Sequence, residues 1–247
     1  MALATVSLLR PAGSYVTAAE VRELIAKVCP AERYRAQRVL LLVPDATRTC
    51  PLGMFFAGIF DQISGVSASL DVMIALGTHP PMSDEAICRR LEISNEERRN
   101  RYAKVRFFNH AWDNHSELRS IGRITADEIE ALSGGLFSME VAITVNRRLF
   151  DYDQIIIIGP VFPHEVVGFS GGNKYLFPGV SGPEVLNFFH WLGAVVTNPM
   201  IIGNKYTPVR KVVDRAASMV TTPKLCFCLV VEQGQLAGVF AGAPESA

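Results

Sequence analysis

Short, unbroken apolar runs constrain what this chain can fold into more than any other feature. Residues 39–43 read VLLLV and residues 155–158 read IIII, and proline or glycine directly follows each run. Apolar runs of about four to eight residues between turn-forming residues are typical of strands buried on both faces, as in a parallel sheet. The same interpretation predicts further strands at residues 70–76, 104–109, 139–146 and 225–232.

Segments with helical periodicity lie between these strands. Helices are predicted at residues 51–64, 83–91, 182–197 and 208–220, and Ser83 is suited to be an N-cap. Strands that alternate with helices predict an α/β fold, here a doubly wound, mostly parallel, Rossmann-like sheet with helices on both faces. In such sheets the ligand crevice lies at the carboxyl ends of the strands.

Chain length and composition suggest how the chain is divided. The 247 residues, 49% of them hydrophobic, suffice for one large α/β domain or a domain and a half. We expect residues 1–220 to form an N-terminal α/β domain that binds a cofactor and a substrate. Residues 221–247 begin a strand and a small-residue turn and then stop, which predicts the start of a second, truncated α/β domain.

The charge balance limits the expected partners. The formal net charge is zero, so the sequence predicts no nucleic-acid and no membrane partner and favours a small molecule. We find no signal peptide, and no apolar run approaches the roughly 18 residues that span a bilayer, so we expect a soluble cytoplasmic protein. The five cysteines have no disulfide or metal-site spacing, which favours buried, reduced thiols.

Polar residues follow three of the predicted strands at their carboxyl ends. Asp45 and Arg48 follow the first strand, His79 follows the second and His164 follows the run at 155–158. Arg48 can clamp a carboxylate or phosphate, with Asp45 orienting it or binding a hydroxyl, although a local salt bridge within the loop is equally compatible. Two histidines at one sheet edge form a candidate acid/base pair, although each alone is more often structural.

The segment PHEVVGFSGGNKYLFPG, residues 163–179, combines a glycine-rich turn with a lysine. Ser170, Gly171 and Gly172 allow the backbone to approach a ligand and to present N–H groups to an anion. Lys174 follows between aromatic residues that would partly bury it, which would lower its pKa and make it a nucleophile. The glycine spacing does not match a P-loop, and an ordinary surface turn is the alternative.

Histidines elsewhere are candidates for metal binding. His190 lies in an apolar helical segment, where it is either a core residue or a ligand for nickel, zinc or iron. His110 and His115 have the spacing of a zinc pair, but no cysteine or third histidine lies near them in the sequence, which disfavours zinc.

Taken together, these motifs resemble one known family. The chain is similar to the N-terminal domain of the nickel-pincer lactate racemase family. The similarity covers most of residues 36–215 and rests on PDATRT (44–49), ALGTHPP (75–81), Asn109-His110, IIIIGPVFPHEVVGFSGGNKYLFPG (155–179) and His190.

The resemblance implies a racemase or epimerase of a 2-hydroxy acid that uses proton-coupled hydride transfer. Its cofactor would be nickel held by pyridinium-3,5-bisthiocarboxylate mononucleotide, which is joined to Lys174 through a thioamide. His190 would complete the nickel ligand set, and His79 and His164 would alternate as general base and acid. Arg48 would hold the substrate carboxylate or the cofactor phosphate. Separate cofactor-assembly enzymes are the implied protein partners.

The chain also departs from the family pattern. Ala46 and Thr49 stand where the family often has histidine and proline, which leaves the substrate open among lactate, malate and other hydroxy acids. Family members carry a second α/β domain that closes over the site, and this chain ends where that domain would begin. The alternative hypothesis is therefore a non-catalytic binder or carrier of the pincer nucleotide or of a small anion.

Overall fold

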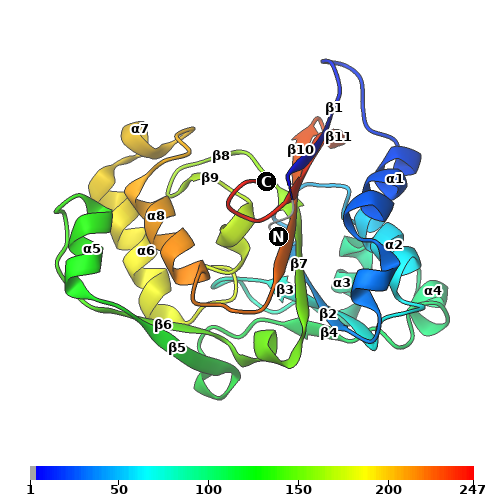
Figure 1. The fold of residues 1–247 in the computed structure, drawn as a ribbon, viewed down its shortest axis with the longest axis horizontal. Coiled ribbons are helices and arrows are strands. Elements are labelled where there is room, and N and C mark those ends of the chain that lie inside the picture. The colour runs from blue at the N-terminus through cyan, green and yellow to red at the C-terminus, as the bar shows by residue number, and fades with distance from the viewer. Residues whose placement is uncertain (1–3) are drawn as a thin grey trace.

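A seven-stranded sheet forms the centre of the molecule in the computed structural model, which describes residues 4–247 (Figure 1). The strand order is β1-β11-β10-β7-β2-β3-β4, in which β10, β7, β2, β3 and β4 are parallel and β11 and β1 are antiparallel to their neighbours. The strands are β1 (Val6–Leu9), β2 (Arg38–Pro44), β3 (Ser69–Ala75), β4 (Phe107–Asn109), β7 (Gln154–Pro160), β10 (Lys224–Glu232) and β11 (Gln235–Gly242).

The apolar runs are continuous because both faces of the sheet are covered. In β2, Leu41 and Val43 enter one hydrophobic core, whereas Leu40 and Leu42 enter the other. All four side chains are fully buried. This alternation explains why a continuous apolar run, rather than an alternating one, predicted the central strands correctly.

Helices lie on both sides of the sheet, as predicted (Figure 1). One core is shared with α1, α2 and α3, and the other with α5, α6 and α8. The helices are α1 (Ala18–Val28), α2 (Leu52–Ile63), α3 (Asp84–Arg90), α4 (Asn95–Arg99), α5 (Ala126–Ser133), α6 (Pro183–Val196), α7 (Asn198–Ile201) and α8 (Pro208–Ala217). The doubly wound, mostly parallel α/β fold is therefore confirmed, and no helix within residues 4–247 is long and apolar enough to cross a membrane.

One predicted strand does not join the main sheet. Strand β6 (Val141–Asn146) instead pairs with β5 (Leu118–Ile124) in a separate antiparallel sheet of two strands. Buried and partly buried side chains alternate along most of β6, because α6 packs against one of its faces. The interpretation of residues 139–146 as a strand was correct, but its expected place in the parallel sheet was wrong.

The structure also corrects the expected division of the chain at residue 220. Strand β10 pairs in parallel with β7, and β11 continues the same sheet towards β1. Cys226 and Cys228 point into the core that lies under α6 and α8. Residues 224–242 therefore complete the sheet that begins before residue 220, and all five cysteines are buried thiols.

Candidate functional site

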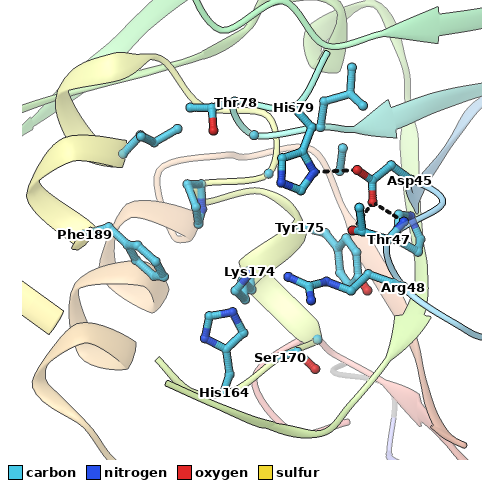
Figure 2. Close-up of a pocket in the computed structure, with 18 of the residues that line it drawn as sticks. Asp45, Thr47, Arg48, Thr78, His79, His164, Ser170, Lys174, Tyr175 and Phe189 are labelled. Atoms are coloured by element: carbon cyan, nitrogen blue, oxygen red, sulfur yellow. Dashed lines mark hydrogen bonds and ion pairs between the residues drawn. The ribbon is translucent and has the colours of Figure 1, made fainter. Parts of the chain in front are cut away.

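A cavity of about 250 Å³ lies at the carboxyl ends of β2, β3 and β7 (Figure 2). Its walls come from the loops after these strands, from the short 3₁₀ helix η4 (Gly172–Tyr175) and from α6. The cavity brings together every predicted site residue except Gly172, namely Asp45, Arg48, His79, His164, Ser170, Gly171, Lys174 and His190.

His79 is held by the carboxylate that follows β2. Its Nδ1 lies 2.5 Å from Oδ2 of Asp45, whose Oδ1 accepts hydrogen bonds from the hydroxyl and backbone N–H of Thr47 at 2.6 and 3.1 Å. Burial raises the pKa of the Asp45 carboxyl, but the hydrogen bonds from Thr47 and His79 outweigh it, so the pKa is lowered. The carboxylate thus favours a proton on Nδ1 of His79 and leaves Nε2 free to accept a proton.

Arg48 projects from the same loop into the cavity (Figure 2). Its guanidinium lies 5.4 Å from the centroid of the Phe162 ring, a cation–π arrangement. Asp45 pairs with His79 rather than with Arg48, so the salt bridge considered within this loop is not formed. The guanidinium therefore presents its charge to the cavity.

The glycine-rich turn has a conformation that requires glycine. Gly171 and Gly172 have φ angles of +86° and +58°, and a Cβ on Gly172 would lie 2.6 Å from the carbonyl oxygen of Pro244. The Ser170 hydroxyl donates to the Pro160 carbonyl and accepts from the Phe162 N–H, both at 2.9 Å. Ser170 therefore fixes the turn from which Lys174 reaches the cavity.

Two further features of the site, one at the turn and one beside His164, were not predicted. Gly172 faces a neighbouring cavity of about 340 Å³ on the other side of the turn, which Ser170 and Gly171 also line. Glu165 lines the main cavity beside His164, with Oε2 at 3.5 Å from Nδ1. The position of Glu165 directly after His164 was the only signal for it in the sequence.

Lys174 has an unusual environment for a lysine. Burial, and after it the positive charge of Arg48, lower the pKa of the amine from 10.5 to about 8, while the carboxylates of Glu165 and Asp45 oppose the shift. A substantial fraction of the amine is therefore neutral near pH 8, which is the form that attacks an electrophile.

His164 is held in the opposite tautomer from His79. Its Nδ1 accepts a hydrogen bond from the backbone N–H of Val166 at 3.1 Å, so the neutral ring carries its proton on Nε2. Burial, followed by the charge of Lys174, lowers the pKa of His164 to about 4. The cavity thus contains one histidine with a free Nε2 lone pair and one with an Nε2–H donor.

His190 lies on α6, at the wall of the cavity opposite the strand ends. Its partial burial, and then the charge of Lys174, lower the pKa of the imidazole. The ring is therefore neutral near pH 7, which is the form that binds metals.

His110 and His115 play no part in the cavity. His110 is buried, and its Nε2 donates to the Ser181 carbonyl at 2.9 Å while Asn146 donates to its Nδ1 at 3.3 Å. His115 begins the exposed 3₁₀ helix η2 (His115–Glu117). His110 is thus a structural histidine that fixes the loop after β4.

Comparison with known proteins agrees with the resemblance in sequence. The family model described as the lactate racemase N-terminal domain matches residues 17–200. Lactate racemase from Lactiplantibacillus plantarum is 25% identical over 219 residues, which are 85% of this chain and 46% of that protein. Lactate racemase from Thermoanaerobacterium thermosaccharolyticum is 21% identical over 220 residues, with the same coverage. The chain thus spans about half the length of the curated relatives it matches.

Solved structures share the fold. A crystal structure of a Thermotoga maritima protein superposes with a TM-score of 0.82 and 28% identity, covering 93% of this chain and 56% of that one. The lactate racemase apoprotein from Thermoanaerobacterium thermosaccharolyticum gives a TM-score of 0.68 at 17% identity, over 92% of this chain and 53% of that one. Because the family model covers most of the sequence, the chain belongs to the lactate racemase N-terminal domain family.

Proposed function

We propose that this chain carries the cofactor and substrate site of a racemase or epimerase of 2-hydroxy acids. The observation that carries the proposal is the convergence of Lys174, His79, His164 and His190 on one cavity at the carboxyl ends of the strands. The partly neutral Lys174 would be the attachment point for a cofactor. His79 would accept a proton and His164 would donate a hydrogen bond, because their rings have opposite tautomers. The neutral imidazole of His190 would bind a metal.

The residues of the cavity fit a nickel-pincer nucleotide. Within residues 4–247, no group of three or more histidine, cysteine, aspartate or glutamate side chains is arranged to hold a metal ion. A metal bound by His190 would therefore take other ligands from outside this set of side chains, which a bound pincer nucleotide would supply, and imidazole suits nickel. Lys174 supplies the amine for a thioamide, and Arg48 supplies a charge for an anionic group of the nucleotide or the substrate.

The chemistry of a 2-hydroxy acid explains why such a site needs both a cofactor and two histidines. The C–H bond beside a carboxylate is only weakly acidic, so direct removal of that proton is costly. When bound, the pincer nucleotide supplies an acceptor for the hydride instead. A histidine of this chain would hold the hydroxyl proton while the carbon is at the ketone level. A group that can both accept and give back a hydride would then allow the centre to be rebuilt in either configuration.

The two histidines would serve opposite faces of the substrate. Nε2 of His79 is free to accept the hydroxyl proton of one enantiomer, and Asp45 stabilises the imidazolium that results. Nε2–H of His164 would donate a hydrogen bond to the substrate oxygen, because Nδ1 is occupied by the Val166 N–H. Formation of a thioamide at Lys174 would remove a charge that lowers the pKa of His164, so attachment of the cofactor would favour the protonated form of His164.

The proposal is tested with the chain co-expressed with cofactor-assembly enzymes. Single enantiomers of lactate and malate are incubated with the loaded protein in deuterium oxide and followed by chiral chromatography and mass spectrometry. We expect inversion without solvent deuterium at C2, because the hydride returns from the cofactor. His79→Gln and His164→Gln should lose turnover, whereas His115→Gln, at an exposed site, should keep it. Deuterium at C2 would contradict hydride transfer.

A binding-only role is the second candidate, because the chain spans about half the length of its curated relatives. In that case the chain would hold the pincer nucleotide or a small anion without turning over a hydroxy acid. Cofactor attached at Lys174 without inversion of any tested acid would favour this role, and inversion by the chain alone would exclude it.

A further inference from the structure

Arg90, the last residue of α3, bonds to the loop between β2 and α2. Its guanidinium donates to the carbonyls of Pro44, Arg48 and Cys50, from Nε at 3.2 Å, Nη2 at 2.8 Å and Nη1 at 3.3 Å respectively. Nη2 also lies 3.0 Å from the Cys50 thiol. One side chain outside the cavity therefore binds both ends and the middle of the loop that carries Asp45.

Within this loop, the other bonds that fix its path are short-range, and the two bonds from Thr47 to Oδ1 of Asp45 span only two residues of the loop. Its backbone hydrogen bonds within the described residues include one from Arg48 N–H to the Asp45 carbonyl at 3.5 Å and one from Leu52 N–H to the Cys50 carbonyl at 2.8 Å. The first is at the outer limit of hydrogen-bond geometry. Arg90 is suited to hold the loop because a guanidinium presents five donors in a rigid fork, whereas a lysine ammonium is a point charge on a flexible stem.

The loop in turn sets the geometry of the cavity. The Asp45 carboxylate accepts a short hydrogen bond from Nδ1–H of His79, with the two atoms 2.5 Å apart. Arg48 enters the cavity from the same few residues. Because hydrogen bonds weaken steeply with distance and angle, a small displacement of the loop would release His79 from its tautomer.

We propose that Arg90 is a positioning residue for the cavity. By holding the loop at residues 44–50, it keeps the Asp45 carboxylate on His79. The same contacts keep Arg48 directed into the cavity. The effect on turnover rests on the proposed function, whereas the effect on His79 concerns this chain alone and needs no cofactor.

The first test uses the chain without cofactor and with ¹⁵N-labelled histidine. Nitrogen chemical shifts of His79 report whether the proton lies on Nδ1 or Nε2. In the unsubstituted chain we expect His79 to show only the Nδ1–H tautomer. In Arg90→Met we expect a mixture of the Nδ1–H and Nε2–H tautomers. Arg90→Lys should give the same mixture, because it keeps the charge but not the fork. The matched control is Arg89→Met, which removes an exposed charge from the same helix and should leave His79 unchanged.

Folding and function are separated by two further measurements. Circular dichroism and the resonances of His110 report the fold, and both should be unchanged in all variants. If Arg90→Met fails to fold, the tautomer of His79 in Arg90→Lys tests the proposal instead. In the loaded protein we expect kcat to fall by about 10- to 100-fold in Arg90→Lys, with a smaller change in KM. An unchanged His79 signature in a folded Arg90 variant would overturn the positioning role of Arg90. A changed His79 signature in a chain that never shows turnover would support that role and contradict only the proposed racemase function.

Discussion

Removal of the positive charge on Lys174 should raise the pKa of His164. Burial is the largest cause that lowers this pKa from 6.5 to about 4, and Lys174 is the next. The difference corresponds to about 3 kcal/mol against the imidazolium. Because burial remains in the variant, the lysine charge accounts for only part of this free energy, roughly 1 kcal/mol, so the pKa of His164 in Lys174→Gln should rise while staying below 6.5.

Histidine NMR over a pH titration provides the assay and an internal control. His110 also has a pKa lowered to about 4, but burial is the main cause and Lys174 does not contribute. Lys174→Gln should therefore raise the pKa of His164 and leave that of His110 in place. Lys205→Gln removes a charge from an exposed site and should change neither.

Two results would refute this reasoning. If the pKa of His164 stays at about 4 in Lys174→Gln, the lysine charge does not reach the imidazole. If the pKa values of His164 and His110 rise together, the substitution has opened the structure. Either result would also remove the argument that cofactor attachment favours protonation of His164.

Three other predictions follow from particular contacts. Asp45→Asn removes the carboxylate that binds His79, so kcat of the loaded enzyme should fall by about 10²- to 10⁴-fold in initial-rate assays, with a smaller change in KM. His110 has a lowered pKa, so its contribution to stability is complete above pH ~6.5 and is lost as the pH falls towards 4. His164 has a similarly lowered pKa and acts in the same direction. Between pH 7.5 and pH 5, urea unfolding should therefore show a fall in the free energy of unfolding of which His110 supplies about 2 kcal/mol, and His110→Gln should lose that part and keep the rest. Gly172→Ala should destabilise the fold by about 2 kcal/mol or more, because φ at this position is positive and the added Cβ would meet the Pro244 carbonyl. The control Gly134→Ala has a similar φ but open space around Cβ, and should cost about 1 kcal/mol in the same unfolding assay. Equal costs for the two variants would show that the close approach to Pro244 is unimportant.

The central strands could be predicted because their signal is local. Every residue of the run at 155–158 is buried, so the sequence shows a continuous apolar segment whatever the neighbouring strands are. The partners of a strand depend on distant residues, which is why β6 and the division at residue 220 were misplaced. Helix α1 was not predicted, although Thr17 and Glu20 form a capping box that the sequence displays.

The site was predictable to the level of its residues but not of its bonds. Sequence placed Asp45 and His79 at one sheet edge, because parallel strands end there together. It could not decide whether Asp45 pairs with Arg48 or with His79, which lies 34 residues away, since that depends on side-chain directions in two loops. The role of Arg90 was hidden for the same reason, because its partners are backbone carbonyls and leave no pattern of side chains in the sequence.

The most direct test of the central claim, that Lys174 is the attachment point of a pincer nucleotide, is the intact mass of the chain after co-expression with cofactor-assembly enzymes. We predict one added mass of cofactor size, mapped by peptide analysis to Lys174, absent from Lys174→Ala and retained in Lys205→Ala. An unmodified mass under conditions that load a known lactate racemase, or an adduct on another lysine, would contradict the claim.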